Sequence, residues 1–295
     1  MPLFDCKELE DQMSQGKFPP LCSIQKRVPY ACCPRNETLP LEPIQGDVMP
    51  RALKTSELDY ENGLCKTIVL SAAHCFYKSP NGTQYLARIG EVKISGKKKN
   101  STVERNVTSV IVHPDYNERQ HYADVALLVL DASARRRRLR RPFACLPDAG
   151  AEPDEDQAIV LGWGHDAFGG RVHTHLQEVK VPLVANDVCN ESYSSLENYA
   201  REFPRGVNDD FVCAGNITYG GVDACQQDSG GPLVTETTRN GQKVLEVIGV
   251  VSFGVGCGSP NFPGVYARVS TYRDWILNKM TQVLPDSQIG LVRDF

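Results

Sequence analysis

The sequence predicts an all-β fold with one C-terminal helix, preceded by a small disulfide-rich module. Three observations lead to this prediction. Short β-branched and apolar runs, separated by turn residues, recur from Leu64 onward, which is typical of a β-sandwich or barrel. Residues 270–284 instead place apolar side chains at helical spacing after a serine. Residues 1–34 are rich in cysteine and hold too little apolar surface for a core of their own.

The runs that predict strands share a high content of valine, isoleucine and leucine. In chain order they are TIVLSA (67–72), YLARIG (85–90), VTSVIV (107–112), DVALLVL (124–130), AIVLGWG (158–164), EVKVPLV (178–184), FVCAG (211–215), GPLVTE (231–236), KVLEVIGVVSFG (243–254) and GVYARV (264–269). Residues 35–63 are polar and contain three prolines, which indicates a linker.

Composition narrows the class of protein further. The chain has 295 residues, 41% of them hydrophobic, and a net charge of −4, which argues against nucleic-acid binding. Eleven cysteines without metal-ligand spacing predict disulfides in an oxidising compartment, and six Asn-x-Ser/Thr sequons agree with secretion. The first fifteen residues lack the apolar segment of a signal peptide, so we expect the original N-terminus to lie upstream of Met1.

Three residues in separate segments predict nucleophilic catalysis. His74 follows an apolar run in SAAHC, Asp124 opens the run DVALLVL, and Ser229 lies in the glycine-rich CQQDSGGP. A serine hydroxyl needs a base to take its proton, which a neutral imidazole does near pH 7. A buried carboxylate fixes the imidazole tautomer and stabilises the imidazolium. Each residue alone has an ordinary structural explanation, but the three contexts in this order predict a Ser-His-Asp triad.

These segments closely resemble the trypsin/chymotrypsin-like serine proteases. Further matches are HPDY (113–116), ACLP (144–147), GWG (162–164), FVCAG (211–215), VSFG (251–254) and PGVYARV (263–269). The resemblance implies two six-stranded antiparallel β-barrels, the first of them incomplete in this chain, with the active site in the cleft between them. It implies a serine endopeptidase with the catalytic residues His74, Asp124 and Ser229. Residues 64–282 would form the protease domain, and residues 283–295 a C-terminal tail.

The resemblance also covers the cysteines. The pattern Cys6…Cys22…Cys32-Cys33-Pro is similar to the second half of a clip domain, the disulfide module of arthropod protease zymogens. An unrelated cysteine-rich linker is the alternative. Residues 1–34 would then be a partial clip-like module, and residues 35–63 a linker with a remnant of the first protease strands. The implied disulfides are Cys65–Cys75, Cys189–Cys213 and Cys225–Cys257, with Cys6–Cys33 as a further candidate. Cys145 matches a position that often bonds a linker cysteine, and residues 34–64 contain none.

Substrate-binding residues follow from the same resemblance. Asp223, six residues before Ser229, matches the floor of the primary specificity pocket in trypsin-like members, and Gly254 and Gly264 match its walls. A carboxylate below a narrow slot would pair with Arg or Lys of the substrate. Residues Ser252, Phe253 and Gly254 match the strand that pairs with substrate backbone, with Phe253 in place of the more usual tryptophan.

Two features depart from the family pattern. Zymogens of this family are cut to release an Ile-Val-Gly-Gly terminus, whose ammonium group pairs with the aspartate that is Asp228 in this chain. The sequence contains no such motif, and residues 46–65 are too short for the missing strands. Gln227 replaces the glycine whose N–H forms the oxyanion hole with that of Ser229. Its side chain would lie near the leaving group, and a glutamine resists the backbone angles of a glycine. We therefore expect the chain as written to be a poor protease.

The function these observations favour is a secreted endopeptidase that cleaves after Arg or Lys in an extracellular zymogen cascade, such as arthropod immunity, clotting or development. Two alternatives stay open: a catalytically impaired homologue that acts as a binding cofactor, and an incomplete translation of an active clip protease. The expected partners are protein substrates, an upstream activating protease and serpin-type inhibitors, with no nucleic acid and no membrane span.

No metal centre and no cofactor are expected. Calcium binding in the loop after Glu91 is a family analogy that the lysines at 97–99 disfavour. The arginine run at 135–141 is expected to be a solvated loop rather than a polyanion-binding surface.

Overall fold

The computed structural model describes residues 67–94, 102–134, 144–153, 156–165, 169–221, 223–239 and 242–283. The predicted clip-like module, the linker, the arginine run and nearly all of the C-terminal tail lie outside these residues.

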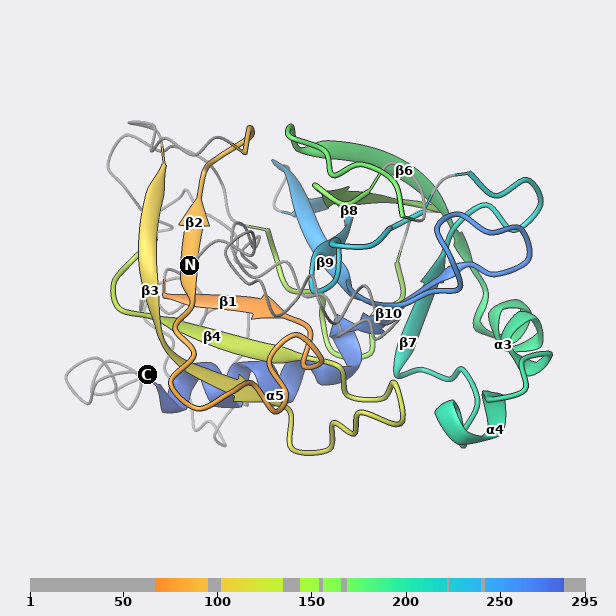
Figure 1. The fold of residues 1–295 in the computed structure, drawn as a ribbon, viewed down its shortest axis with the longest axis horizontal. Helices are drawn as coiled ribbons and strands as arrows, with labels where there is room; N and C mark the ends of the chain where they lie inside the picture. The colour runs from red at the N-terminus through yellow and green to blue at the C-terminus, as the bar shows by residue number, and fades with distance from the viewer. Residues whose placement is uncertain are drawn as a thin grey trace, which may run out of the picture.

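The elements follow the predicted order of strands ending in a helix (Figure 1). They are β1 (Ile68–Ser71), β2 (Leu86–Ile89), β3 (Val103–Val112), β4 (Ala126–Leu130), β5 (Gln157–Gly162), β6 (Gln177–Val184), α3 (Asn186–Ser194), α4 (Tyr199–Glu202), β7 (Phe211–Ala214), β8 (Pro232–Arg239), β9 (Gln242–Phe253), β10 (Gly264–Arg268) and α5 (Val269–Gln282). The predicted all-β fold with a C-terminal helix is confirmed.

The first half of the described chain forms an antiparallel sheet in the order β1-β4-β3-β2. All four residues of β1 are buried, as are four of the five in β4, so these strands form continuous apolar runs without alternation. Val69 and Leu127 are among the most deeply buried side chains. Four strands are described in this half, in line with the expectation of an incomplete first barrel.

The second half closes on itself. Within the described residues, six antiparallel strands form a barrel in the order β10-β7-β6-β5-β8-β9. Inward-facing side chains such as Val160, Val181, Leu233 and Tyr266 fill its interior. Strands β8 and β9 form a long hairpin, and β9 ends at Phe253.

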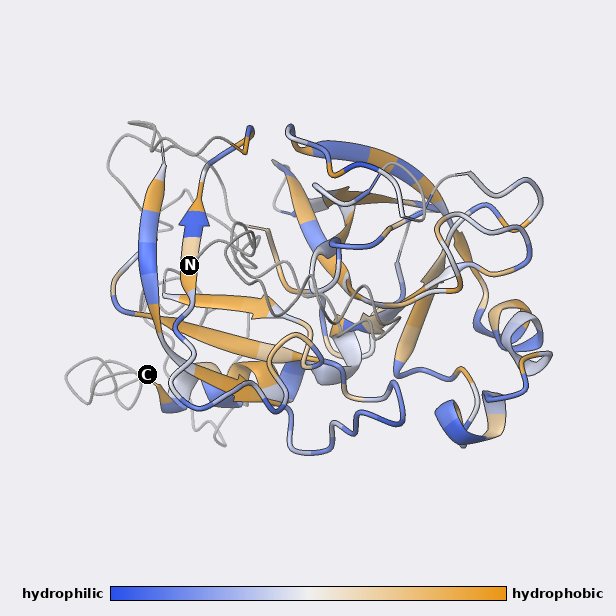
Figure 2. Cartoon of the chain, in the orientation of Figure 1, coloured by the Kyte–Doolittle hydropathy of each residue, from blue (hydrophilic) through white to orange (hydrophobic). Residues whose placement is uncertain are grey.

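Helix α5 joins the two halves. It leaves β10 and runs beneath the first sheet (Figure 1), and its residues Tyr272, Ile276 and Met280 belong to one apolar cluster with side chains of both halves. In Figure 2 the central strands β1 and β4 are mostly hydrophobic, whereas the outer strands β2, β3 and β6 also carry hydrophilic segments. The helix begins at Val269, one residue before the predicted serine start, and has no side-chain cap. Val269 is fully buried, so packing fixes the start of the helix.

Two short helices, α3 and α4, were not predicted from the sequence. They lie beside β7, at the right of Figure 1. Their side chains join an aromatic cluster that includes Tyr193, Phe203 and Phe211. Helix α3 has a single acidic residue in its first turn and no capping side chain, so its sequence carries little of the usual helix-start signal. No described helix is long and apolar enough to cross a membrane.

Candidate active site

His74 and Asp124 lie just beyond the ends of two adjacent strands of the first sheet. His74 lies in the turn after β1, and Asp124 precedes β4, which pairs with β1. The imidazole Nδ1 of His74 lies 2.7 Å from Oδ2 of Asp124, and the backbone N–H of His74 donates to Oδ1 at 2.8 Å. The two contacts fix both the position and the orientation of the imidazole relative to the carboxylate, as the predicted triad requires.

The carboxylate of Asp124 is surrounded by donors. Its side chain is 2% exposed, and Ser252 donates its hydroxyl to Oδ2 at 2.5 Å. Burial alone would raise the pKa of this carboxyl group, but the charge and hydrogen bonds of His74 and the Ser252 hydroxyl outweigh it, so the pKa of Asp124 is lowered. Asp124 is therefore ionised at neutral pH and holds a proton on the facing nitrogen of His74.

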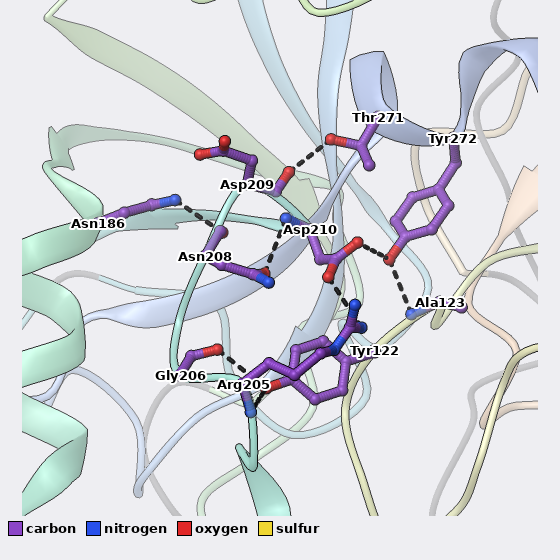
Figure 3. Close-up of polar contacts among 10 residues, drawn as sticks. All are labelled: Tyr122, Ala123, Asn186, Arg205, Gly206, Asn208, Asp209, Asp210, Thr271 and Tyr272. Atoms are coloured by element: carbon purple, nitrogen blue, oxygen red, sulfur yellow. Dashed lines mark hydrogen bonds and ion pairs between the residues drawn. The ribbon is translucent and has the colours of Figure 1, made fainter.

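The backbone ahead of Asp124 is held in an unusual conformation. Ala123 has a φ of 55°, which is uncommon for a residue other than glycine and persists where its surroundings enforce it. The buried N–H of Ala123 donates to the phenolic oxygen of Tyr272 in α5 at 2.8 Å. The Tyr272 hydroxyl in turn donates to Oδ1 of Asp210 at 3.0 Å. Helix α5 thus reaches the turn that carries Asp124 (Figure 3).

The same polar network continues through the loop before β7 (Figure 3). Arg205 pairs with Oδ2 of Asp210 at 3.0 Å, and its guanidinium lies 4.1 Å from the centre of the Tyr122 ring. The Tyr122 hydroxyl accepts the N–H of Arg205 at 2.8 Å and donates to the carbonyl of Gly206 at 2.9 Å. Residues 122 and 123 are therefore both anchored, on different partners, immediately before Asp124.

Ser229 lies in the loop between Cys225 and β8. Its neighbour Gly230 accepts the hydroxyl of Ser71 at 3.3 Å, and a β-carbon on Gly230 would come within 3.3 Å of Cys75 Sγ. These contacts bring the Ser229 loop against the 71–75 segment, which carries His74. Among the described residues, no hydrogen bond occupies the N–H of Ser229 or that of Gln227. Their roles as nucleophile and oxyanion donors stay predictions.

Gln227 adopts the left-handed backbone conformation that is typical of glycine. Its φ is 74°, one of four positive values for non-glycine residues in the described chain. Its side-chain amide lies 3.0 Å from Nε2 of His165. The glutamine therefore occupies a backbone region that glycine favours, and its side chain contacts His165, which is not one of the predicted site residues.

Asp228 is largely buried, and its closest contacts within the described chain are backbone N–H groups. Its Oδ1 accepts the N–H of Gly164 at 2.8 Å, and its Oδ2 accepts the N–H of Cys225 at 3.0 Å. A β-carbon on Gly164 would lie 2.2 Å from this carboxylate, so only glycine fits there. Burial raises the pKa of Asp228, while the two N–H donors and the nearby His173 and His165 oppose the rise. The predicted activation partner thus lacks an ammonium group among the described residues.

Asp223 is the third carboxylate of the site. Its Oδ1 accepts the N–H of Ala224 at 2.7 Å and the hydroxyl of Tyr266 at 3.3 Å. Burial raises the pKa of Asp223 to about 7. A β-carbon on Gly264 would lie 2.4 Å from Oδ1, whereas one on Gly254 would meet nothing within 4 Å. Gly264 thus lies against the carboxylate and Gly254 borders open space, as the predicted pocket walls would.

Phe253, the last residue of β9, belongs to a group of packed aromatic side chains. Its ring centre lies 4.1 Å from that of His121, which is itself three residues before Asp124. Burial lowers the pKa of His121, although Glu202, with Oε2 3.6 Å from Nε2, opposes this. His121 is therefore neutral near pH 7 and packs as an aromatic side chain. No sequence motif indicates that His121 lies beside Phe253, or that Glu202 of α4 lies next to His121.

The structure contains disulfides between Cys189 and Cys213 and between Cys225 and Cys257, which are pairs that the resemblance implies. Cys145 is also disulfide-bonded. Cys65 and Cys6 lie outside the described residues, so their pairings stay predictions. In the described segments, no three His, Cys, Asp or Glu side chains are grouped to hold a metal ion.

Comparison with known proteins gives consistent matches. The family model described as Trypsin matches residues 64–276. The chain is 35% identical to "Clotting factor G beta subunit" of Tachypleus tridentatus over 217 residues, 72% of this chain and 67% of that protein. It is 39% identical to "Trypsin" of Phaedon cochleariae over 219 residues, 74% of this chain and 76% of that protein. It is 36% identical to human "Transmembrane protease serine 11B" over 212 residues, 72% of this chain but 47% of that protein.

Proposed function

Given that the chain belongs to the trypsin family of serine-type endopeptidases, we propose that it cleaves protein substrates after arginine or lysine. The observation that supports this specificity is the Asp223 carboxylate. It is partly buried, its pKa is raised to about 7, and no Lys, Arg or His of the described residues forms an ion pair with it. A buried carboxylate without a cation is unfavourable, and the guanidinium or ammonium group of a substrate would relieve that cost.

The proposed reaction follows from the order of contacts. Because the N–H at Nδ1 of His74 donates a hydrogen bond to the Asp124 carboxylate, the basic lone pair of the imidazole lies on Nε2. This nitrogen takes the proton of Ser229 as its Oγ attacks the scissile carbonyl. The N–H groups of Gln227 and Ser229 stabilise the oxyanion, and the imidazolium then protonates the leaving amine. Water hydrolyses the acyl-enzyme by the reverse sequence of proton transfers.

The proposal places this reaction outside the cell, in a cascade of proteolytic activations. Two disulfides in the described barrel agree with an oxidising compartment, and one relative carries the name of a clotting factor subunit. In such a cascade an upstream protease would activate the chain, and serpin-type inhibitors would control it. The sequons and the clip-like cysteines of the N-terminal region fit the same proposal.

A second candidate is a homologue with little turnover that acts by binding. The observation in its favour is Gln227, whose backbone occupies a left-handed conformation at an oxyanion-hole position. Displacement of one oxyanion donor typically lowers kcat by about a hundred- to a thousand-fold. Such a protein would still bind a basic side chain, because the Asp223 carboxylate takes no part in holding the oxyanion.

The deciding experiment measures specificity and turnover separately. Residues 1–295 are expressed alone, and a chimera adds an Ile-Val-Gly-Gly activation strand; each is made with and without Gln227→Gly. Arginine-ester and phenylalanine-ester hydrolysis report activity, and benzamidine binding reports the Asp223 site. A protease should hydrolyse the arginine ester in preference, most rapidly in the chimera. Equal turnover of the two esters would contradict the specificity, and benzamidine binding without turnover in every protein would support the second candidate.

A further inference from the structure

The loop after β5 holds three consecutive residues of the nucleophile loop. The N–H of His165 donates to the carbonyl of Gln226 at 3.0 Å, and the N–H of Gly164 donates to Asp228 at 2.8 Å. Between them, the side chain of Gln227 is bonded to the His165 imidazole at 3.0 Å. Residues 164 and 165 thus contact residues 226, 227 and 228 on the segment that leads directly into Ser229.

The hydrogen bond between the Gln227 side chain and His165 acts on a residue whose backbone conformation is unfavourable for a non-glycine residue. Gln227 has a φ of 74°, a region that glycine enters readily and other residues avoid. A residue in that region stays there when its surroundings over-determine it. The contacts at Gln226 and Asp228 fix the chain on both sides, but the contact with His165 is the one made by the glutamine side chain itself.

We propose that His165 is a positioning residue, which uses its hydrogen bond to the Gln227 side chain to hold the Gln227 N–H in the oxyanion hole. This inference rests on the proposed function, since it concerns an oxyanion donor. The side chain that the family's glycine lacks then has two effects: it makes the backbone conformation unfavourable, and it supplies the tether that maintains it. His165 acts through Gln227 and does not itself touch the substrate.

The imidazole is suited to this role. Its backbone is fixed by the bond to Gln226 and by a short antiparallel bridge with Val172, close to the end of β5. Neutral imidazole Nε2 can donate or accept, and a glutamine amide offers both a donor and an acceptor, so the bond persists with either tautomer. The other ring nitrogen, Nδ1, is buried and has no hydrogen-bond partner in the described chain, so Nε2 is the nitrogen that holds the ring in place.

A simpler view, in which the Gln227 side chain only obstructs the leaving group, predicts a different order of activities. If obstruction is the whole effect, kcat should rise from Gln227 through Gln227→Ala to Gln227→Gly as the side chain shortens. If the tether matters, Gln227→Ala should be the slowest, because alanine keeps the unfavourable left-handed backbone and loses the bond to His165. Gln227→Gly should be fastest under both views, because glycine adopts this φ without strain.

The test is a double-mutant cycle on residues 1–295, with kcat for an arginine ester as the readout. His165→Ala should lower kcat about tenfold, with KM little changed, as expected for one hydrogen bond of ordinary strength acting in the transition state. The same change in Gln227→Gly should alter kcat less than about twofold, because no side chain remains to be held. His165→Gln, which places an amide near the Nε2 position, should recover most of the loss, whereas the shorter His165→Asn should not.

His175→Ala is the matched control. His175 belongs to the same stretch, is exposed, and has its Nδ1 3.2 Å from the hydroxyl of its neighbour Thr174, so kcat should not change. An equal loss from His165→Ala in the Gln227 and Gln227→Gly proteins would overturn the inference, since it would mean a general effect on folding. The inference would also be overturned if kcat decreased in the order Gln227→Gly, Gln227→Ala and the unmodified protein, with the unmodified protein slowest.

A second readout separates this inference from the proposed function. The free energy of unfolding is measured for the single and double variants of Gln227→Ala and His165→Ala. Non-additive changes would establish the tether, and additive changes would overturn it whether or not the protein hydrolyses esters. If the coupling is present but no variant, Gln227→Gly included, has esterase activity, the proposed function fails, and with it the catalytic role assigned to His165.

Discussion

Asp124 and Asp223 are carboxylates of the same candidate site, the first fully and the second partly shielded from solvent, and their pKa values shift in opposite directions. Asp124 accepts hydrogen bonds from the N–H of His74 and the hydroxyl of Ser252 and pairs with the His74 imidazole, and its pKa is lowered. Asp223 accepts a backbone N–H and a long hydrogen bond from a tyrosine hydroxyl, and burial raises its pKa to about 7. Asp228 shares the direction of Asp223.

The difference separates two tasks that buried carboxylates perform. The fold supplies Asp124 with its partners in advance, so that this side of the site is electrostatically complete before substrate binds. Asp223 and Asp228 are left with charge that a cation from outside the described residues would stabilise. The lowered pKa of Asp124 reflects partners that it already has, and the raised pKa of Asp223 is consistent with the proposed binding of a substrate cation there.

The largest effect should come from removing the charge of Asp124. Asp124→Asn keeps the shape of the side chain but removes the charge that holds the proton on Nδ1 of His74. We expect kcat for an arginine ester to fall by about 10⁴. Benzamidine affinity should stay the same, because the proposed cation site at Asp223 does not include Asp124. A parallel loss of benzamidine binding would mean that the two carboxylates are not independent.

The second-largest effect on arginine-ester hydrolysis should come from removing the Asp223 carboxylate. Asp223→Ser should lower kcat/KM for an arginine ester by about 30- to 5,000-fold, the range for loss of one member of a buried charge pair. Labelling of Ser229 by a fluorophosphonate should continue, because His74 and Asp124 are untouched. If this variant retained the preference for arginine, Asp223 would not be the residue that determines specificity.

A pH titration tests the raised pKa of Asp223 without mutation. The raised pKa means that Asp223 in the empty site is protonated below about pH 7 and ionised above it. A benzamidinium cation binds the ionised form, so its affinity should be constant at high pH and fall by about tenfold between pH 8 and pH 6. Calorimetry over this range should also detect proton release on binding near pH 6. In Asp223→Ser the pH dependence should disappear; its persistence would assign it to another group.

The smallest effect on kcat should come from removing the Tyr272 hydroxyl, which accepts a hydrogen bond from the residue before Asp124. Tyr272→Phe leaves the buried N–H of Ala123 without its acceptor, which should lower the free energy of unfolding by about 1 to 3 kcal/mol. Because Ala123 directly precedes Asp124, kcat should also fall, by far less than in Asp124→Asn.

Tyr85→Phe is the control for the Tyr272 variant. It removes a phenolic hydroxyl that is bonded to Ser79 and not to a residue adjoining Asp124. We expect a small loss of stability from this change and no change in kcat. Equal kcat in Tyr272→Phe and the unmodified protein would show that the turn before Asp124 does not need this contact.

The predicted strands and the C-terminal helix occur where the alternation of apolar runs and turns predicts them. The helices α3 and α4 were missed, because their sequences are polar and weakly capped and they are held by the aromatic cluster around Phe203. The start of α5 was displaced by one residue, because the burial of Val269 determined it and the serine did not. These differences arise where tertiary packing outweighs local propensity.

Short segments of neighbouring residues are enough to indicate the family, the order of His74, Asp124 and Ser229, and the unusual glutamine at position 227. The groups that serve these residues come from distant parts of the chain and could not be read from it. Ser252 reaches Asp124 from 128 residues away, and Tyr272 reaches Ala123 from 149. His165 bonds to Gln227 across 62 residues. Such contacts depend on strand register and on tertiary packing, neither of which is local to the chain. The same packing decides which partners each buried carboxylate receives, and the balance between burial and those partners sets the direction of its pKa shift.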